Sequence, residues 1–289
     1  MRKNSVLIIL IILFGLNVFA WVAVYELAQP QFLEVNFFDV GQGDAIFIVT
    51  PQRHQILIDG GPGPAILEKL AKEMPFYDRS IDLIILTHPE ADHLTGLIEV
   101  LKNYKVDFIL WTAVARDTFQ WREWQKLIES QREKGAQLLI ARPGQKIIAS
   151  RTVLDILFPL ENLEGQIFSD SNDTSIMAKL VFGENSFLFT GDILKSGEGR
   201  LIRAGADINS DVLKVAHHGS KTSSADEFIE KVSPEIAVIS VGKDNRYGHP
   251  HQEILETLDK YGITVLRTDR DGDIKIFSDG ENLKISNFQ

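Results

Sequence analysis

Cysteine is absent from the 289 residues of this chain, which excludes disulfide bonds and thiolate metal ligands. Any metal site must therefore be built from histidine nitrogens and oxygen ligands. A surplus of positive charge is also missing, because the formal net charge is −10 at pH 7. That charge disfavours nonspecific attraction to nucleic acid, although a local basic patch could override it. With 44% hydrophobic and 24% charged residues, the composition is otherwise that of an ordinary globular protein with a full-sized core.

Charged residues are missing from residues 6–25, VLIILIILFGLNVFAWVAVY. An uncharged run of ~20 residues has the length of a membrane-spanning helix. Arg2 and Lys3 precede the run and Glu26 follows it, which predicts a cytoplasmic N-terminus with the rest of the chain outside the cytoplasm. We therefore expect a single-pass anchor in the cell membrane. The alternative is a signal segment cleaved near Ala20, where VFA suits signal peptidase, and this would release a secreted protein.

Apolar runs in the rest of the chain predict strands and helices in an alternating order. We expect strands at residues 32–38, 45–50, 55–59, 81–87, 106–114, 152–159, 175–183, 186–191, 211–216, 236–242, 263–268, 273–278 and 282–287. We expect helices at residues 64–74, 93–104, 117–135, 196–205, 224–232 and 251–262. This order predicts an α/β fold with two sheets face to face and helices outside, a four-layer αββα sandwich. Residues 32–289 are expected to form one domain, preceded by an anchor or signal segment at residues 1–27.

The sequence HPEADH places His88, Glu90, Asp92 and His93 where a buried strand ends and a helix begins. A turn at this point can direct several side chains into one space, and a metal ion would balance all of these polar groups together. The alternative is an ordinary helix start, at which the two acidic residues favour the positive end of the helix dipole.

Two other strand ends carry metal-ligand residue types. Asp192 directly follows the run SFLFTG, and His217 and His218 follow DVLKVA. Any one of them alone would be interpreted as a capping aspartate or a surface histidine. Because α/β folds build their sites at strand ends, the three strand ends together predict a single site.

These motifs resemble the metallo-β-lactamase superfamily, whose H-x-H-x-D-H signature corresponds to residues 88–93 and whose bridging aspartate corresponds to Asp192. More narrowly, FFDVGQGDAIFI, SNDTSIMAKLVFGENSFLFTGD, LKVAHHGS and NRYGHPH are similar to the extracellular hydrolase domain of ComEC-type competence proteins, which take part in DNA uptake. The similarity covers residues 32–289. ComEC-type proteins also have a multi-helix channel region, whereas this chain has one apolar run, so transport is not implied.

The resemblance implies two divalent metal ions, with a water or hydroxide between them as the nucleophile. By the resemblance, the ligands of the first ion are His88, Glu90 and Asp192, and those of the second are Asp92, His93, Asp192 and His217. The superfamily pattern has histidine at position 90, and its third histidine is replaced within SNDTS, where Asn172 or Asp173 could supply an oxygen. Oxygen-rich ligation favours Mn²⁺ or Mg²⁺ relative to Zn²⁺, although metal availability can still favour Zn²⁺.

His249 in RYGHPH is expected to bind a phosphoryl oxygen or to protonate the leaving group, with Asp92 and His218 as the other members of the catalytic set. The alternative is that His249 and His251 only cap the following helix. Asp59 and Ser220 are expected to support the ligands. The glycine-rich loop at residues 59–64 could bind an anion or could simply pack closely. The basic residues that could supply a local positive field for substrate are Lys221, Lys243 and Arg246.

We therefore expect a metal-dependent phosphodiesterase acting on DNA, or on another phosphodiester, outside the cytoplasm. Its expected partners are the membrane, through the N-terminal segment, and competence or DNA-uptake proteins. The first alternative is a hydrolase of a lactone or phosphocholine ester, because the same metal chemistry serves many esters. The second is a non-catalytic binding module that keeps the fold.

Overall fold

The computed structural model describes residues 2–28 and 32–287, and the chain divides into two compact units at residues 1–31 and 32–289. The first unit contains helix α1 (Arg2–Ala28), so the N-terminal segment is helical as expected. Among the described residues, no helix is long and apolar enough to cross a membrane, so the membrane span expected over residues 6–25 is not supported.

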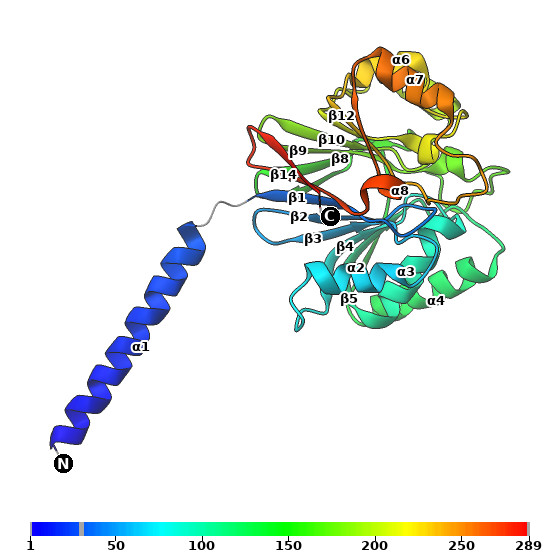
Figure 1. Ribbon diagram of the computed structural model, residues 1–289. Helices are drawn as coiled ribbons and strands as arrows, with labels where there is room; N and C mark the ends of the chain where they lie inside the picture. Colours follow the sequence, from blue (N-terminus) through cyan, green and yellow to red (C-terminus); the bar gives the residue numbers. More distant parts are fainter. Residues whose placement is uncertain (1, 29–31, 288–289) are drawn as a thin grey trace. The chain divides into compact units, whose positions relative to one another are not determined.

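Two β-sheets lie face to face in the second unit, and helices cover their outer faces (Figure 1). Within the described residues, eight strands form one sheet in the order β15-β14-β1-β2-β3-β4-β5-β6. Seven strands form the other in the order β13-β12-β11-β10-β9-β8-β7. The first sheet contains β1 (Leu33–Phe37), β2 (Ile46–Val49), β3 (Gln55–Ile58), β4 (Ser80–Ile85), β5 (Lys105–Trp111), β6 (Gln137–Ile140), β14 (Ile274–Ser278) and β15 (Leu283–Asn287). The second contains β7 (Lys146–Ala149), β8 (Thr152–Phe158), β9 (Met177–Phe182), β10 (Asn185–Phe189), β11 (Val212–Lys214), β12 (Ile236–Ile239) and β13 (Thr264–Arg267).

Each sheet is buried on both faces, which explains why its strands have nearly continuous apolar sequences. In β2, Ile46 and Ile48 face the core between the sheets, while Phe47 faces the core beneath the outer helices. The larger helices are α2 (Ala65–Glu73), α3 (Ala91–Asn103) and α4 (Phe119–Glu133) over the first sheet, and α5 (Lys195–Arg203), α6 (Asp226–Val232) and α7 (Gln252–Lys260) over the second. The short helices are α8 (Thr268–Asp271), η1 (Asn172–Thr174) and η2 (Ala216–Gly219). The predicted αββα arrangement is therefore confirmed.

Two short strands lie where the sequence pattern predicts none. They are β6 and β7, and each forms the edge of a sheet. Their side chains are only half-buried or exposed, so the apolar alternation that identifies a buried strand is weak there.

The loop after β3 packs closely against α3 at two glycines. A Cβ atom on Gly60 would lie 2.4 Å from the backbone nitrogen of Leu97, and one on Gly96 would lie 1.8 Å from the carbonyl oxygen of Gly60. No side chain fits at either position, so this contact explains both glycines without an anion. It also holds the first turn of α3, which carries Asp92 and His93, against the end of β3.

Candidate metal centre

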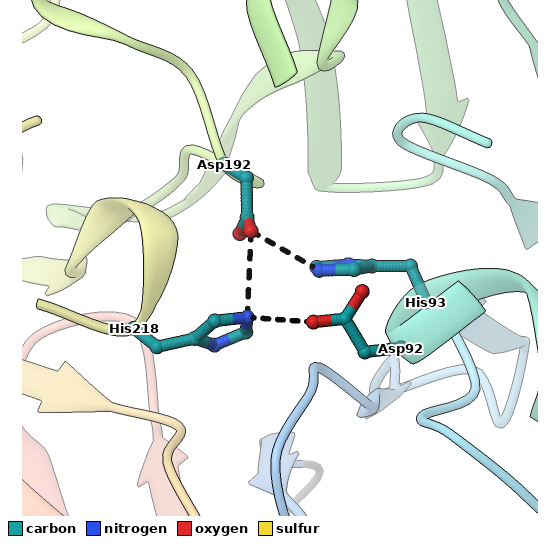
Figure 2. A group of neighbouring side chains, drawn as sticks. All are labelled: Asp92, His93, Asp192 and His218. Carbon is teal, nitrogen blue, oxygen red and sulfur yellow. Dashed lines mark ion pairs between the residues drawn. The ribbon is translucent and has the colours of Figure 1, made fainter. Parts of the chain in front are cut away.

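Four side chains from three strand ends converge on one point (Figure 2). Asp92 and His93 lie in the first turn of α3, Asp192 follows β10, and His218 lies in η2 directly after β11. Asp192 Oδ2 is 3.4 Å from His93 Nε2 and 3.3 Å from His218 Nε2. His218 Nε2 is also 3.4 Å from Asp92 Oδ2. One ligand atom from each residue lies within 4.8 Å of the others, which is the spacing of a metal-binding group.

The hydrogen bonds of the two imidazoles point their Nε2 atoms into this group. His93 Nδ1 lies 2.8 Å from Asp59 Oδ2, and His218 Nδ1 lies 2.8 Å from the carbonyl oxygen of Ser240. A carbonyl can only accept, so His218 carries its proton on Nδ1 and leaves Nε2 for a ligand. Carboxylate–histidine pairs such as Asp59–His93 orient metal-binding imidazoles in the same way.

Several atoms facing the group are buried and lack a hydrogen-bond partner among the described residues. They are the Nε2 atoms of His88, His93 and His218 and Asp192 Oδ1. Leaving buried polar atoms unsatisfied is costly, and a divalent cation would satisfy all of them together. The residues present therefore fit a metal ion.

His88 lies beside the same group of side chains. Thr87 Oγ1 donates to Asp59 Oδ2 at 2.6 Å, so it accepts from His88 Nδ1, which is 3.0 Å away. This arrangement leaves His88 Nε2 unprotonated. Burial and the positive charge of His93 lower the pKa of His88 to about 3, so the imidazole is neutral at physiological pH.

The electrostatics of the group couple metal and proton binding. Burial opposes charging of His93, but the carboxylates of Asp192 and Asp59 raise its pKa well above the usual value. Burial likewise opposes charging of His218, but Asp192 and Asp44 raise its pKa. In the metal-free protein these imidazoles hold protons that a metal ion must displace.

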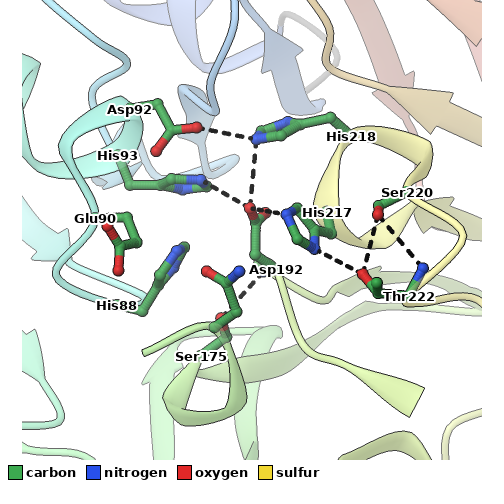
Figure 3. A network of polar contacts seen from close by, with 12 residues as sticks. His88, Glu90, Asp92, His93, Ser175, Asp192, His217, His218, Ser220 and Thr222 are labelled. Carbon is green, nitrogen blue, oxygen red and sulfur yellow. Dashed lines mark hydrogen bonds and ion pairs between the residues drawn. The ribbon is translucent and has the colours of Figure 1, made fainter. Parts of the chain in front are cut away.

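His217 lies beside the group of four. Both His217 and His218 have left-handed backbone conformations, with φ of 51° and 55°. His217 Nε2 is 3.9 Å from Asp192 Oδ2, and its Nδ1 is 3.1 Å from Thr222 Oγ1, which also contacts Ser220 Oγ at 2.9 Å (Figure 3). The geometry thus places His218 in the position that the sequence analysis expected for His217, and it places Ser220 behind His217.

A pocket of about 210 Å³ opens over the group. Its lining residues are Gln42, Glu90, Asp92, Asn172, Asp192, His217, His218, Tyr247 and His249. His249 stacks on Tyr247 with ring centroids 5.7 Å apart. Burial and the positive charges of His218 and His217 lower the pKa of His249 to about 4.

Comparison with known proteins identifies the family. The model of the metallo-β-lactamase superfamily matches residues 38–243. The chain belongs to this superfamily. Its curated relatives include ComE operon protein 3 of Bacillus subtilis, which is 33% identical over 259 residues that cover 84% of this chain and 32% of the relative. Competence protein ComA of Neisseria gonorrhoeae is 30% identical over 242 residues, which cover 82% of this chain and 31% of the relative.

The chain spans about a third of the length of these curated relatives. The resemblance to the ComEC-type hydrolase domain is confirmed, and the superfamily is one of metal-dependent hydrolases whose fold implies divalent ions, typically two.

Solved structures with the same fold include the metallo hydrolase Igni18 of Ignicoccus hospitalis, with a TM-score of 0.53 and 15% identity, covering 89% of this chain and all of that one. The diiron β-hydroxylase CmlA of Streptomyces venezuelae has a TM-score of 0.55 and 14% identity, covering 90% of this chain and 55% of that one. At this identity both show the fold alone.

The carboxylate of Glu90, which the resemblance assigns to the first ion, is engaged by two neighbouring side chains. Glu90 Oε1 accepts from Arg116 Nη2 at 2.5 Å and also from the hydroxyl of Ser171. Asn172 lines the pocket, whereas Asp173 accepts from the Ser196 hydroxyl at 2.7 Å. Glu90 therefore lines the pocket, but its carboxylate is paired with the guanidinium of Arg116. Asp173 is hydrogen-bonded to Ser196 instead.

The three basic residues expected to face substrate do not line the pocket. Lys221, Lys243 and Arg246 are exposed, and none of them lines the pocket. Arg246 donates to the hydroxyl of Tyr247 at 3.1 Å, so it is held beside the rim.

Sequence reasoning missed two buried residues behind the metal group, Asp44 and Lys214. Both occur in motifs that resemble the ComEC-type domain, Asp44 in DVGQGD and Lys214 in LKVAHHGS. Burial alone would raise the pKa of Asp44, but the Lys214 ammonium and His218 hold it below its usual value. A buried lysine that pairs with an aspartate from the other sheet has no local sequence signal, so only the motif membership could have indicated them.

Proposed function

We propose that this chain is a metal-dependent phosphodiesterase that cleaves DNA. The observation that carries the proposal is the group Asp92, His93, Asp192 and His218, three of which line a small pocket and three of which carry buried polar atoms without a hydrogen-bond partner among the described residues. The competence proteins among the curated relatives support DNA as the substrate.

The size of the pocket supports a phosphodiester rather than a whole small molecule. Pockets that enclose a drug-sized ligand usually have volumes of ~300–1,000 Å³, and this one has about 210 Å³. It has room for one phosphate group, while the rest of a polymer stays outside. Lys221, Lys243 and Arg246 are exposed, and Arg246 is bonded to the pocket residue Tyr247, so they can contact neighbouring backbone phosphates despite the negative net charge.

The ion would be held by the group of four, with His88 Nε2 and Glu90 at the adjoining position. When bound, it supplies Lewis-acid activation of water and neutralises charge on the phosphoryl oxygens. Two histidines and two aspartates suit Mn²⁺ or Zn²⁺, and the carboxylates also permit Mg²⁺.

His249 has a distinct part in the proposed reaction. Because its pKa is lowered to about 4, its imidazole is neutral near pH 7 and is not already charged as an acid. A neutral imidazole still donates one ring N–H hydrogen bond, which can hold a phosphoryl oxygen as charge develops on it. We therefore favour phosphoryl binding over protonation of the leaving group.

The location outside the cytoplasm is a separate part of the proposal. It rests on Arg2 and Lys3 before the N-terminal apolar run and Glu26 after it. Competence or DNA-uptake proteins are the proposed partners. Protease added to intact spheroplasts should digest the domain if it is anchored outside, and recovery of a chain beginning near Trp21 would favour secretion. Full protection from protease would refute the external location.

The substrate assignment can be tested with the purified chain. Single- and double-stranded DNA should be cleaved with Mn²⁺ and should survive with chelator or with the Asp192→Asn variant. Lactones and phosphocholine esters in the same assay separate the alternative hydrolases. A folded, metal-loaded protein that cleaves an ester but no DNA would refute the nuclease proposal, and one that cleaves nothing would indicate a binding module.

A further inference from the structure

A lysine–aspartate ion pair lies behind the metal group and joins the two sheets. Lys214 is the last residue of β11 in the second sheet, and Asp44 lies in the segment between β1 and β2 of the first. Lys214 Nζ contacts Asp44 Oδ2, and both side chains are almost completely buried. Neither residue lines the pocket, so neither can contact substrate there.

Both partners also contact the residues that form the metal group. Asp44 Oδ1 is 3.4 Å from His218 Nδ1, the nitrogen opposite the one that faces the group. Lys214 Nζ donates to the carbonyl oxygen of Gly191 at 3.2 Å, in the peptide bond that precedes Asp192. The same Nζ is 3.8 Å from Asp192 Oδ1.

We propose that Lys214 and Asp44 are positioning residues that hold His218 and Asp192 in the arrangement that binds metal. Asp44 lies against the Nδ1 side of the His218 ring, next to the hydrogen bond of this nitrogen to the carbonyl oxygen of Ser240, and so restricts the ring from that side. Lys214 holds the backbone that carries Asp192. Its positive charge also balances the negative charge of Asp44, so that this second carboxylate can be buried behind the metal group. The proposal depends on the metal centre and not on the identity of the substrate.

The burial of this pair is hard to explain by stability alone. Removing a lysine and an aspartate from water costs free energy that their mutual attraction often fails to recover, and apolar or neutral replacements are commonly as stable. Residues that orient metal ligands typically change metal affinity by 10- to 100-fold when they are removed. A positioning role therefore predicts a loss of metal binding that is separable from a loss of stability.

The test uses the paired variant Lys214→Met/Asp44→Asn in the purified full-length chain. Because both charges are removed together, neither is left buried alone, and we expect a melting temperature in chelator close to that of the wild type. We expect Mn²⁺ affinity, measured by titration of the metal-free protein, to fall at least ~10-fold. The control is Lys69→Met/Asp273→Asn, which removes a partly buried pair with a 2.7 Å contact that does not touch the metal group. It should keep wild-type Mn²⁺ affinity.

Wild-type Mn²⁺ affinity in a folded Lys214→Met/Asp44→Asn variant would overturn the proposal. If the paired variant does not fold, Lys214→Gln/Asp44→Asn decides, because it also removes both charges together and keeps hydrogen-bonding groups at both positions. A folded Lys214→Gln/Asp44→Asn variant with unchanged affinity overturns the proposal, and a loss of several-fold supports it. Affinity is measured without substrate, so failure of the DNA assay would leave this result intact.

Discussion

Replacing Asp192 with asparagine should weaken metal binding more than any other single change of a carboxylate to an amide at the site. Asp192 is buried, and its Oδ2 lies within 3.4 Å of the Nε2 atoms of both His93 and His218. Asparagine has the same shape but lacks the negative charge. The backbone N–H of Asp192, which donates to Ser175 Oγ at 3.0 Å, is unchanged.

The expected loss of metal affinity depends on the contacts that each carboxylate already makes. Changes to residues that only orient ligands cost 10- to 100-fold in affinity, so loss of a central ligand should cost more than ~100-fold, or ~2.7 kcal/mol. Glu90 lies at the pocket, but Arg116 and Ser171 already occupy its Oε1. Glu90→Gln should therefore cost less than ~10-fold.

Titration of the metal-free proteins with Mn²⁺ measures the dissociation constant of each variant. A melting transition in the presence of chelator shows that each variant is folded. The reasoning predicts at least a 10-fold gap between Asp192→Asn and Glu90→Gln. Equal affinities for the two folded variants would refute the assignment of Asp192 as the central ligand.

Three further predictions concern catalysis, metal binding and stability. His249→Ala should lower kcat by roughly 10² with unchanged metal content, because one hydrogen bond to the developing charge is lost; a variant with normal kcat and a lower melting temperature would show a structural role instead. Mn²⁺ affinity should rise with pH from 6 to 8, since the raised pKa values of His93 and His218 mean that binding displaces protons; a pH-independent affinity would contradict this. Burial raises the pKa of Glu198 to about 7, although the carboxylate accepts hydrogen bonds from the backbone N–H groups of residues 224 and 225. Between about pH 4.5 and 7 the folded state therefore keeps a proton that the unfolded chain has released. Stability should therefore fall as pH rises from about 4.5 to 7, and Glu198→Gln should flatten that fall in urea unfolding; equal slopes would count against it.

Much of the fold could be predicted because burial on two faces leaves a strong sequence signal. Strands such as β2 and β12 are continuous apolar runs. The edge strands β6 and β7 were missed because only part of each is buried. The expected membrane span has no support among the described residues.

The sequence could predict which strand ends form the site, but not which side chain at each strand end faces it. The positions of Asp92, His93 and Asp192 directly after strands predicted that they share one site, and the structure brings their ligand atoms within 4.8 Å of one another. The sequence could not choose between His217 and His218, since the choice depends on two consecutive left-handed residues. It also could not foresee that Arg116, from a loop 26 residues away, would pair with Glu90.

The central claim is that the group of four side chains binds a divalent metal ion. Anomalous diffraction from crystals grown with Mn²⁺ tests it most directly, because the signal locates the ion independently of any assay. The account predicts an ion bound by Asp92, His93 Nε2, Asp192 and His218 Nε2. Crystals that show no ion at this position, or that place His218 away from the ion, would contradict it.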